Sequence, residues 1–264
     1  MKLRNDHVLI LGGGSGIGLG IAARFLSAGA AVTIVGRTEE KLKKAAAELN
    51  SDKLFTLTAD VSDCGGHEKL FAEAAEKMGG LDAFVNAAAI SLQAAGRGYE
   101  PWDITPEEWD LMSDTNYKAA FFLMRNEIEY LKARGIRGNI LNFASNAAVQ
   151  DIIGPYGSAK LSIINWTRSF GKQYGHDGIV INGIAPGATL TPMIASYAHS
   201  LDQPYPRHAL ERFIRVDEIA ELAFYLMSDF GEIIVGHTVV ADAGDNNWSD
   251  LPVFQGTKPW ERGE

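Results

Sequence analysis

The sequence predicts a single α/β domain in which a doubly wound parallel sheet of about seven strands carries helices on both faces. Short runs rich in β-branched residues alternate along the 264 residues with longer segments of helical period. Several of these runs are almost continuously apolar, as expected of strands that are covered on both faces. No linker, low-complexity segment or internal repeat divides the chain. We therefore expect one domain over residues 1–264.

The expected strands are short apolar runs, at 7–12, 31–36, 53–59, 82–88, 139–145, 179–185 and 237–242. The expected helices lie between them, at 16–28, 39–49, 66–78, 106–133, 155–174 and 217–228. In the first helix, Ile17, Ile21 and Phe25 form an apolar stripe, and Gly29 is placed to end it. Alternation of this kind predicts parallel strands joined by helical crossovers.

Two segments fall outside this alternation, and both follow expected strands. Residues 91–106 form a loop punctuated by Gly and Pro, and residues 191–213 are rich in Pro, Tyr and His. In a doubly wound sheet, ligands bind at the carboxyl ends of the strands, where both segments would lie. We expect such a segment, 191–213 in particular, to act as a substrate lid over a core of residues 5–244. An ordinary surface excursion is the alternative.

Aromatic residues also occur in the C-terminal tail and along one expected helix, where the alternation of strands and helices does not explain them. The polar C-terminal tail, 245–264, carries Trp248, Phe254 and Trp260. Such a tail indicates docking on a neighbouring surface, such as another subunit, and a frayed terminus is the alternative. Trp166 and Phe170, four residues apart on an expected helix, are interpreted as packing or subunit contacts.

Composition limits the partners of the protein. The formal net charge of −9 argues against a nucleic-acid surface, which needs a basic footprint. No apolar run approaches the ~20 residues of a membrane span, so no membrane partner is expected. The N-terminus lacks an apolar secretory region, and Cys64 is the only cysteine, so a cytoplasmic setting without an internal disulfide is expected. The histidines have no metal-ligand spacing, and no metal site is expected.

A glycine-rich stretch joins the first expected strand to the first expected helix. The stretch satisfies G-x-x-x-G-x-G, with Gly12, Gly16 and Gly18 in the fixed places, but not the strict dinucleotide fingerprint. Backbone N–H groups at the positive end of a helix are suited to hold a pyrophosphate. The sequence therefore predicts a dinucleotide site here, with a ligand-free tight turn as the alternative.

The end of the second expected strand indicates which dinucleotide is preferred. An NAD site would place a carboxylate there, but Gly36 is followed by Arg37 and Thr38. A cation and a hydroxyl suit a 2′-phosphate, so NADP(H) is the expected cofactor. NAD(H) is the alternative if Glu39 or Glu40 turns to the ribose.

Tyr156 and Lys160 stand four residues apart on an expected helix. Spacing alone does not separate an acid–base pair from two surface residues, but on one helical face they would lie about 5–6 Å apart. An ammonium beside a phenol favours the phenolate, so Tyr156 could exchange a proton with a carbonyl oxygen during hydride transfer. Ser145, at the end of the fifth expected strand, would hydrogen-bond that same oxygen.

These stretches together resemble the short-chain dehydrogenase/reductase family over residues 5–244. The motifs occur in the family's order, as GGGSGIG, ADVSD, VNAAA, DTNYKAAFF, LNFAS, YGSAK and IAPGATLTP. The resemblance implies a Rossmann-type fold and a catalytic set of Asn116, Ser145, Tyr156 and Lys160. It implies cofactor contacts by Gly12, Ser15, Gly16, Ile17, Gly18, Arg37, Thr38, Asp60, Val61, Asn86, Tyr156, Lys160, Pro186, Gly187 and Thr191.

The resemblance also implies individual roles. Asp60 would meet the adenine amino group, and Thr191 would bind the nicotinamide carboxamide. Lys160 would hold the ribose hydroxyls, and Asn116 would position a water that links Lys160 to solvent. Asn86 would lie at the cofactor and the central sheet. The family commonly forms tetramers through the helix that carries the tyrosine and its neighbour, so a homo-oligomer, tetramer or dimer, is expected.

The function expected from these residues is NADP(H)-dependent interconversion of a secondary alcohol and a ketone. A nucleotide-binding regulator without turnover and a family member that reduces a carbon–carbon double bond are the alternatives. Ala147, Ala148 and Ala188, with Met193 and Tyr197 in the expected lid, predict a roomy, mostly apolar pocket for a small molecule. The run from 145 to 156 is one or two residues shorter than the family pattern, which predicts a different substrate space.

Overall fold

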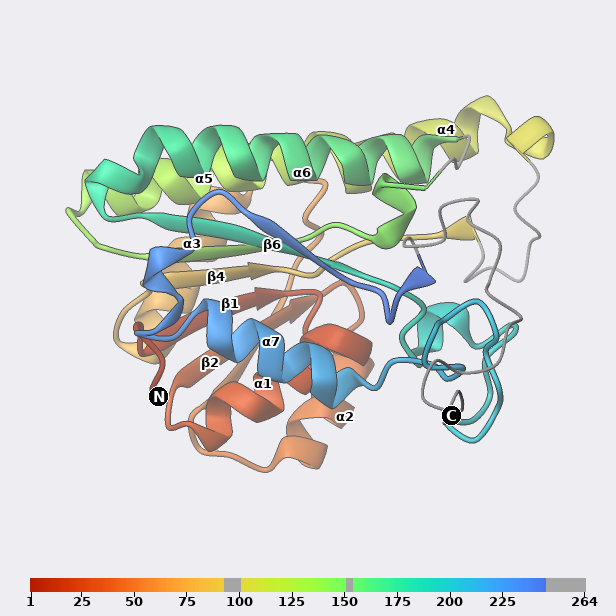
Figure 1. Cartoon of the computed structure of the whole chain (residues 1–264). Coiled ribbons are helices and arrows are strands. Elements are labelled where there is room, and N and C mark those ends of the chain that lie inside the picture. The colour runs from red at the N-terminus through yellow and green to blue at the C-terminus, as the bar shows by residue number, and fades with distance from the viewer. Residues whose placement is uncertain (93–100, 151–153, 246–264) are drawn as a thin grey trace, which may run out of the picture.

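Seven strands form one parallel sheet in the computed structural model, which describes residues 1–92, 101–150 and 154–245 (Figure 1). The strand order is β3-β2-β1-β4-β5-β6-β7. The strands are β1 (His7–Leu11), β2 (Ala31–Gly36), β3 (Leu54–Thr58), β4 (Ala83–Asn86), β5 (Asn139–Phe143), β6 (Val180–Pro186) and β7 (Thr238–Ala241). The expected α/β fold with a single parallel sheet is confirmed.

The order of the strands creates a crevice at one place in the sheet. From β1 the chain steps outward to β2 and β3, then returns to β4 on the other side of β1 and continues outward to β7. The direction of winding therefore reverses between β1 and β4. In doubly wound sheets the ligand crevice lies outside the carboxyl ends of the strands at this switch point.

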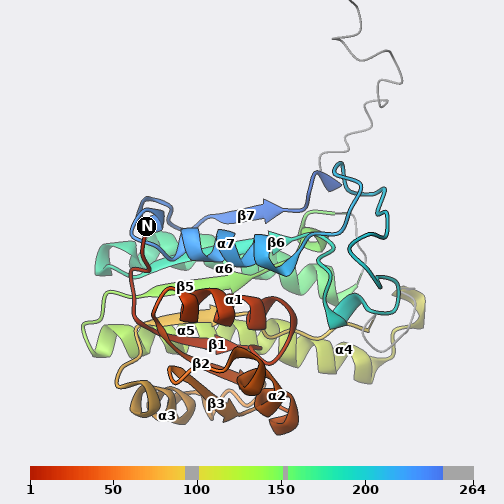
Figure 2. The ribbon, with the colours of Figure 1, turned by 90° about the horizontal axis from the view of Figure 1, so that it is seen from below.

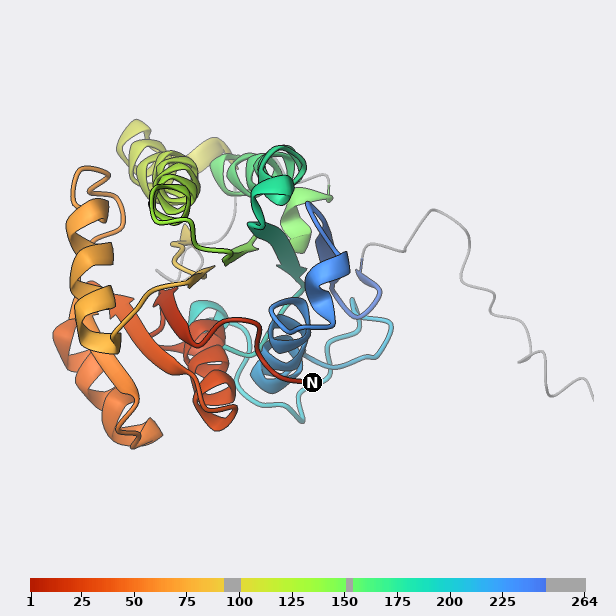
Figure 3. The same cartoon turned by 90° about the vertical axis from the view of Figure 1, so that its left-hand side faces the viewer.

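Helices cover both faces of the sheet, as the views along two other directions show (Figures 2 and 3). One face carries α1 (Gly16–Ser27), α2 (Glu39–Leu49) and α7 (Val216–Leu226). The other carries α3 (His67–Met78), α5 (Ala119–Ala133) and α6 (Pro155–Tyr174). Helices α1 and α7 lie side by side although most of the sequence separates them.

The pleat of β1 divides its apolar run between two cores. Val8 and Ile10 pack in the cluster with α1 and α7, and Leu9 and Leu11 pack in the cluster with α3 and α5. All four side chains are fully buried. Successive side chains of a strand point to opposite faces, so a strand covered on both sides has to be apolar throughout.

The long helix expected at 106–133 is interrupted. Helix α4 (Pro106–Met112) passes into a π-helical turn, Ser113–Lys118, before α5 begins. Asn116 lies in this turn, and its amide makes two hydrogen bonds to the backbone of Ile90. The helical period continues through the turn in the sequence, so the pattern alone did not signal the interruption, although π-turns often occur at functional sites.

The segment expected to act as a lid runs along the carboxyl end of the sheet. It contains a short 3₁₀ turn, Pro192–Ile194, and is tied down by bridges between Thr189 and Ile214 and between Pro204 and Arg212. Half of the expected loop at 91–106, namely 93–100, and the aromatic residues of the tail lie outside the described residues. Within the described ranges, no helix is long and apolar enough to cross a membrane.

Candidate active site

Two adjoining pockets occupy the crevice at the switch point of the sheet. The first, of about 290 Å³, lies over the glycine-rich stretch and the end of β2. The second, of about 360 Å³, lies over the ends of β5 and β6. The two pockets share five lining residues, namely Ile17, Ala87, Ala89, Thr191 and Met193. They therefore form one continuous cleft.

Two glycines of the glycine-rich stretch, Gly12 and Gly18, leave no room for a side chain. Gly12 has a φ of +85°, and a Cβ there would lie 2.7 Å from the backbone of Ala88. A Cβ on Gly18 would overlap the carbonyl oxygen of Gly12. Helix α1 begins at Gly16, and the side chain of its N-cap, Ser15, makes no capping hydrogen bond. Residues 14–18 line the first pocket, so the uncapped start of α1 opens onto the cleft, as a pyrophosphate site requires.

Positive charge lines the far end of the first pocket, beyond β2. Arg37, Thr38 and Lys41 line this end. Thr38 is the N-cap of α2 but makes no side-chain capping hydrogen bond, so its hydroxyl is available to a ligand. Lys41 was not identified from the sequence. It lies in the first turn of α2, three residues after the N-cap Thr38, so a search of that turn for a second cation could have found it.

Asp60 is the one acidic residue among those that line this pocket in the described part of the chain. Burial opposes its ionisation, but hydrogen bonds from the backbone and hydroxyl of Ser62, together with the charge of Arg37, hold the pKa of Asp60 below its ordinary value. The two bonds from Ser62 measure 2.9 and 2.8 Å. Asp60 is therefore an anionic acceptor, and Val61 lines the pocket beside it.

Ser145, Tyr156 and Lys160 line the second pocket together. Tyr156 lies in the first turn of α6, directly after Pro155, whose fixed φ suits the start of a helix. Ser145 follows β5, where its Oγ accepts a 3.2 Å hydrogen bond from the N–H of Ala147. Chain connectivity brings them together, because the end of β5 and the start of α6 lie at the same edge of the sheet.

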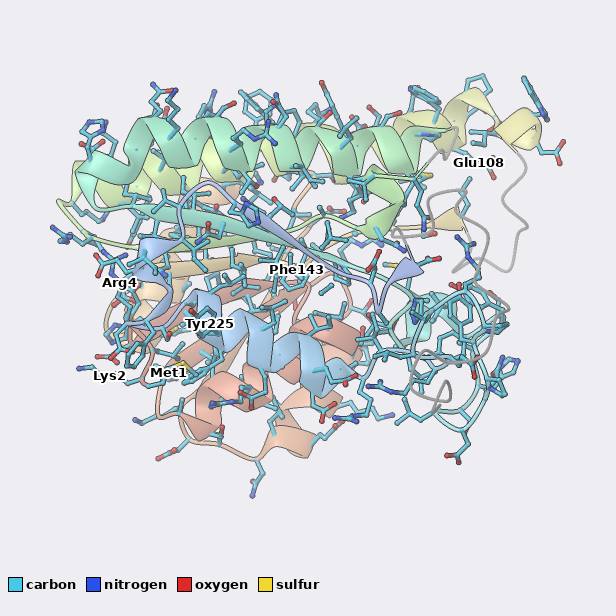
Figure 4. The ribbon with its side chains drawn as sticks, in the orientation of Figure 1. Met1, Lys2, Arg4, Glu108, Phe143 and Tyr225 are labelled. Atoms are coloured by element: carbon cyan, nitrogen blue, oxygen red, sulfur yellow. The ribbon has the colours of Figure 1, made fainter. Side chains whose placement is uncertain are left out.

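Lys160 lies one turn beyond Tyr156 and is 3% exposed. Its Nζ lies 5.7 Å from the centre of the Tyr156 ring. Nζ also donates a 2.8 Å hydrogen bond to the carbonyl of Phe143, which ends β5 in the interior beneath α6 (Figure 4). Burial lowers the pKa of Lys160 to about 8. The charge of this ammonium is therefore sensitive to pH near neutrality.

Asn116 and Asn86 lie behind the cleft and do not line it. The Asn116 side chain accepts a 2.9 Å bond from Ile90 N–H and donates a 2.8 Å bond to Ile90 C=O, so it fixes the chain that leaves β4. The Asn86 side chain donates to Glu127 and Asn142 in the interior. The side chain of Asn86 therefore belongs to the central sheet, as expected, and its contact with the cofactor stays a prediction. The following residues, Ala87 and Ala89, line the cleft instead.

The expected lid and the end of β6 supply the remaining walls. Pro186, Gly187 and Thr191 line the second pocket, and residues from the 191–213 segment extend it, namely Met193, Ile194, Tyr197, Tyr205 and Arg207. Burial, followed by the nearby Tyr205 and Tyr156, raises the pKa of Tyr197 to about 12. Tyr197 is therefore a neutral phenol at the edge of the pocket.

A polar wall interrupts the expected apolar lining. The carboxylate of Asp245 accepts bonds from Asn146 and Gln150, both at 2.9 Å, and from Arg207 at 3.4 Å, and all four residues line the pocket. Ala147 and Ala188 line it as expected, but Ala148 does not. Nothing in the sequence signalled the wall, because its members come from three distant segments. Residues 151–153, in the short approach to Tyr156, lie outside the described residues.

Comparisons with known proteins agree with this arrangement. A family model described as enoyl-(acyl carrier protein) reductase matches residues 12–246. Levodione reductase of Leifsonia aquatica is 33% identical over 254 residues, covering 90% of this chain and 93% of that protein.

Two solved structures show the same fold with a dinucleotide bound. One is a 3-ketoacyl-(acyl-carrier-protein) reductase from Brucella melitensis complexed with NADH, with a TM-score of 0.79 at 27% identity over 90% of this chain and 97% of that one. The other is a short chain dehydrogenase from Burkholderia cenocepacia J2315 in complex with NADP, with a TM-score of 0.81 at 26% identity over 93% and 100%.

The breadth of these matches goes beyond a shared fold. The family model spans nearly the whole described chain, and the Leifsonia relative aligns along almost its full length. The cleft brings the glycine-rich stretch close to Ser145, Tyr156 and Lys160. These residues belong to the motifs by which the sequence resembles the family. The chain therefore belongs to the short-chain dehydrogenase/reductase family and is an NAD(P)-dependent oxidoreductase of the kind that acts on CH–OH groups.

Proposed function

We propose that this protein is an NADP(H)-dependent oxidoreductase that interconverts a secondary alcohol and a ketone, with Tyr156 as the general acid and base. One observation carries the proposal: Ser145, Tyr156 and Lys160 line a single pocket that opens directly onto the glycine-rich cradle. A substrate carbonyl in this pocket would reach a hydroxyl donor and the reactive end of a dinucleotide at once.

The bound nicotinamide supplies or takes up the hydride, and the protein's residues handle the proton. In reduction, the Tyr156 hydroxyl donates its proton to the carbonyl oxygen, and in oxidation the phenolate takes the alcohol proton. The buried ammonium of Lys160 stabilises that phenolate. Ser145 donates a hydrogen bond to the same oxygen and stabilises the charge that develops on it. Asn116 keeps the segment after β4 in place beside them.

The preference for NADP(H) rests on the charge beyond β2. Arg37 and Lys41 supply two cations, and the uncapped hydroxyl of Thr38 supplies a donor at the positive end of α2. Asp60 lies further along the pocket as an acceptor suited to an adenine amino group. Thr191, Pro186 and Gly187 stand at the other end, where a nicotinamide ring would be held. NAD(H) is the alternative cofactor, as the NADH-bound relative illustrates.

The polar wall supports a substrate class. Asp245 holds Asn146, Gln150 and Arg207 by hydrogen bonds in a pocket that the apolar residues Ala188 and Met193 also line. A hydrocarbon substrate would take these polar groups out of water without offering them a further hydrogen bond, which costs free energy. We therefore expect a small substrate that carries a second oxygen function beside the reacting one, such as a hydroxyketone or a diol.

The description of the matching family model favours a second candidate, reduction of a carbon–carbon double bond in an acyl thioester. A panel of ketones, diols, simple alcohols and a 2-enoyl thioester, run with both cofactors, separates the candidates by the absorbance of reduced nicotinamide. The proposal expects turnover with the ketones and diols and faster rates with NADP(H). Turnover with the enoyl thioester alone would overturn it, and binding without any turnover would favour a regulator.

Assembly and location also belong to the proposal. Helices α5 and α6 present an aromatic face on which Phe121 packs against Trp166 and Phe170. These contacts support the packing interpretation of the two residues, and a second copy of the chain would cover the face in a dimer or tetramer. We expect a cytoplasmic enzyme without nucleic-acid or membrane partners. Light scattering in solution tests the assembly directly.

A further inference from the structure

A buried carboxyl group lies directly behind the cleft, outside the catalytic set. Glu127, on the inner side of α5, has no exposed surface. Its Oε2 accepts a 3.0 Å hydrogen bond from Nδ2 of Asn86. Among the described residues, neither Oε1 of Glu127 nor Oδ1 of Asn86 has a hydrogen-bond partner, although both atoms are buried. Two unpaired acceptors therefore belong to two side chains that already touch.

No charged group neutralises this carboxyl within the described part of the chain. On the helices packed against α5, the buried titratable groups among the described residues are His67 at the start of α3 and Lys160 on α6. The ring of His67 bonds to the carbonyl of Val61 and to the side chain of Asn126, and Lys160 donates to Phe143.

On α5 itself, the neighbouring titratable side chains Arg125 and Tyr130 contact residues other than Glu127. Arg125 pairs with Glu129 and contacts Asn126, and Tyr130 packs edge-on against aromatic rings of α3 and β4. The salt bridges among the described residues do not include Glu127. An ionised carboxylate at this position would thus be buried without a counter-charge, which is strongly unfavourable.

The contact of Glu127 continues into a chain of hydrogen bonds that joins four elements. The second Nδ2 hydrogen of Asn86, on β4, is donated to Oδ1 of Asn142 on β5 at 2.9 Å. Asn142 in turn donates to Oγ1 of Thr167 on α6 at 3.0 Å. The residues that follow Asn86 line the cofactor cleft, and the residue after Asn142, Phe143, accepts the bond from Lys160.

We propose that Glu127 is a neutral carboxylic acid in the folded protein and acts as a positioning residue for the cleft. Its Oε1 hydroxyl donates to Oδ1 of Asn86 while Oε2 accepts from Nδ2, which closes a two-bond pair between the acid and the amide. This pairing uses both orphaned oxygens and fixes the orientation of the amide. Asn86 then holds Asn142, and the ends of β4 and β5 are set at a fixed separation.

Burial supports this assignment. It raises the pKa of Glu127 to about 8, and the hydrogen bond from Asn86 opposes the shift only in part. A carboxylate has no hydrogen to donate. Ionisation would therefore leave Oε1 of Glu127 and Oδ1 of Asn86 buried without a hydrogen bond. The acid–amide pair itself is independent of the proposed function, whereas its effect on cofactor binding rests on that function.

Two substitutions at this position separate pairing from packing. In Glu127→Gln, the amide has the shape of the neutral acid, donates through Nε2 to Asn86 Oδ1 and accepts through Oε1. We expect this variant to keep kcat and the KM for the cofactor within about twofold of the wild type. Glu127→Leu fills a similar volume without hydrogen bonds, and we expect its cofactor KM to rise about tenfold, more than kcat falls. Glu129→Gln, an exposed change on the same helix, serves as the control.

Two measurements need no substrate, so they can fail independently of the proposed function. At pH 7, the infrared band of a protonated carboxylic acid should be present in the wild type and absent from Glu127→Gln. In unfolding experiments, the folded state keeps the proton up to about pH 8, while the unfolded chain loses it above the ordinary value of 4.5. The wild type should therefore lose stability relative to Glu127→Gln as pH rises between these values, with a slope of about one proton, and level off above them.

Each part of the proposal, the neutral acid and the positioning role, has a result that would overturn it. A wild type without the acid band, or a stability difference that does not change with pH, would show that Glu127 is ionised and would end the proposal. If Glu127→Gln and Glu127→Leu raised the cofactor KM equally, the side chain would act through packing alone and the positioning role would be wrong.

Discussion

The two halves of the cleft are built in different ways. The pyrophosphate cradle of the cofactor half comes from one short stretch, Gly12 to Gly18, whose surface is formed by backbone atoms and the start of α1. The substrate half is assembled from side chains that meet across the chain: Asn146 and Asp245 lie 99 residues apart, and Arg207 and Asp245 lie 38 apart. Backbone geometry tolerates little change, whereas side chains on loops can be exchanged singly.

This difference separates the residues that determine the reaction from the residues that select the substrate. The cradle, Ser145, Tyr156 and Lys160 define what kind of chemistry is possible, and the wall around Asp245 defines which molecule undergoes it. Substitutions in the first group should affect all substrates alike. Substitutions in the second group should affect substrates unequally. The predictions that follow test this division, from the largest effect to the smallest.

Ser145→Ala should have the largest effect of this group. Loss of the hydroxyl that stabilises the developing charge is expected to lower kcat by about 10²–10³-fold for every substrate, because the reacting oxygen is common to all. NADPH affinity, measured by fluorescence titration, should be unchanged. A loss below tenfold, or a loss confined to one substrate, would group Ser145 with the wall around Asp245, which selects the substrate.

Arg37→Ala should act on the cofactor alone. Loss of a charge-assisted bond to a 2′-phosphate is expected to weaken NADPH binding by about 10–100-fold and NADH binding by less than twofold. Lys41→Ala should act in the same direction with a smaller effect. Lys44→Ala, on the same helix but outside the pocket lining, is the matched control. Equal weakening of both dinucleotides would refute the assignment of NADP(H).

The pH dependence of the rate should report Lys160. Burial lowers the pKa of Lys160 to about 8, so its ammonium loses its charge as pH rises through that value. Because the charged form stabilises the Tyr156 phenolate, kcat/KM for reduction is expected to fall about tenfold per pH unit above that pKa. Steady-state rates from about pH 6 to 10 supply the profile. A profile that stays flat to the upper limit would separate Lys160 from the proton transfer.

Asp245→Asn should give the smallest and most selective effect. The asparagine amide has the shape of the Asp245 carboxylate. It lacks the negative charge and one of the two acceptor oxygens that Asn146, Gln150 and Arg207 use. We expect kcat/KM for a diol to fall by about threefold to tenfold, and that for the matching mono-alcohol by less than twofold. Competition between the two alcohols in one assay measures the ratio directly. Equal losses would mean that the wall supports the fold and does not select the substrate.

The sequence predicted the contiguous features and missed the long-range ones, for a physical reason. A strand covered on both faces must be apolar throughout, and a loop that holds a pyrophosphate must lack side chains, so β1 and Gly12–Gly18 carry their own signals. Glu127 has no such signal, because a glutamate on a helix normally faces water and only the packing of α5 shows that it is buried. Asn86 illustrates the same limit: its position follows from the motif, but the direction of its side chain follows from its partners on α5 and β5.

Tyr156→Phe tests the central claim most directly, since it removes one oxygen atom from the substrate half and nothing from the cradle. We expect NADPH to bind with nearly unchanged affinity by fluorescence titration, while ketone reduction in a single turnover falls by about 10³-fold or more. Tight cofactor binding with turnover abolished is the predicted result. Retained reduction in the variant would contradict the account, because the proton would then come from a group other than Tyr156.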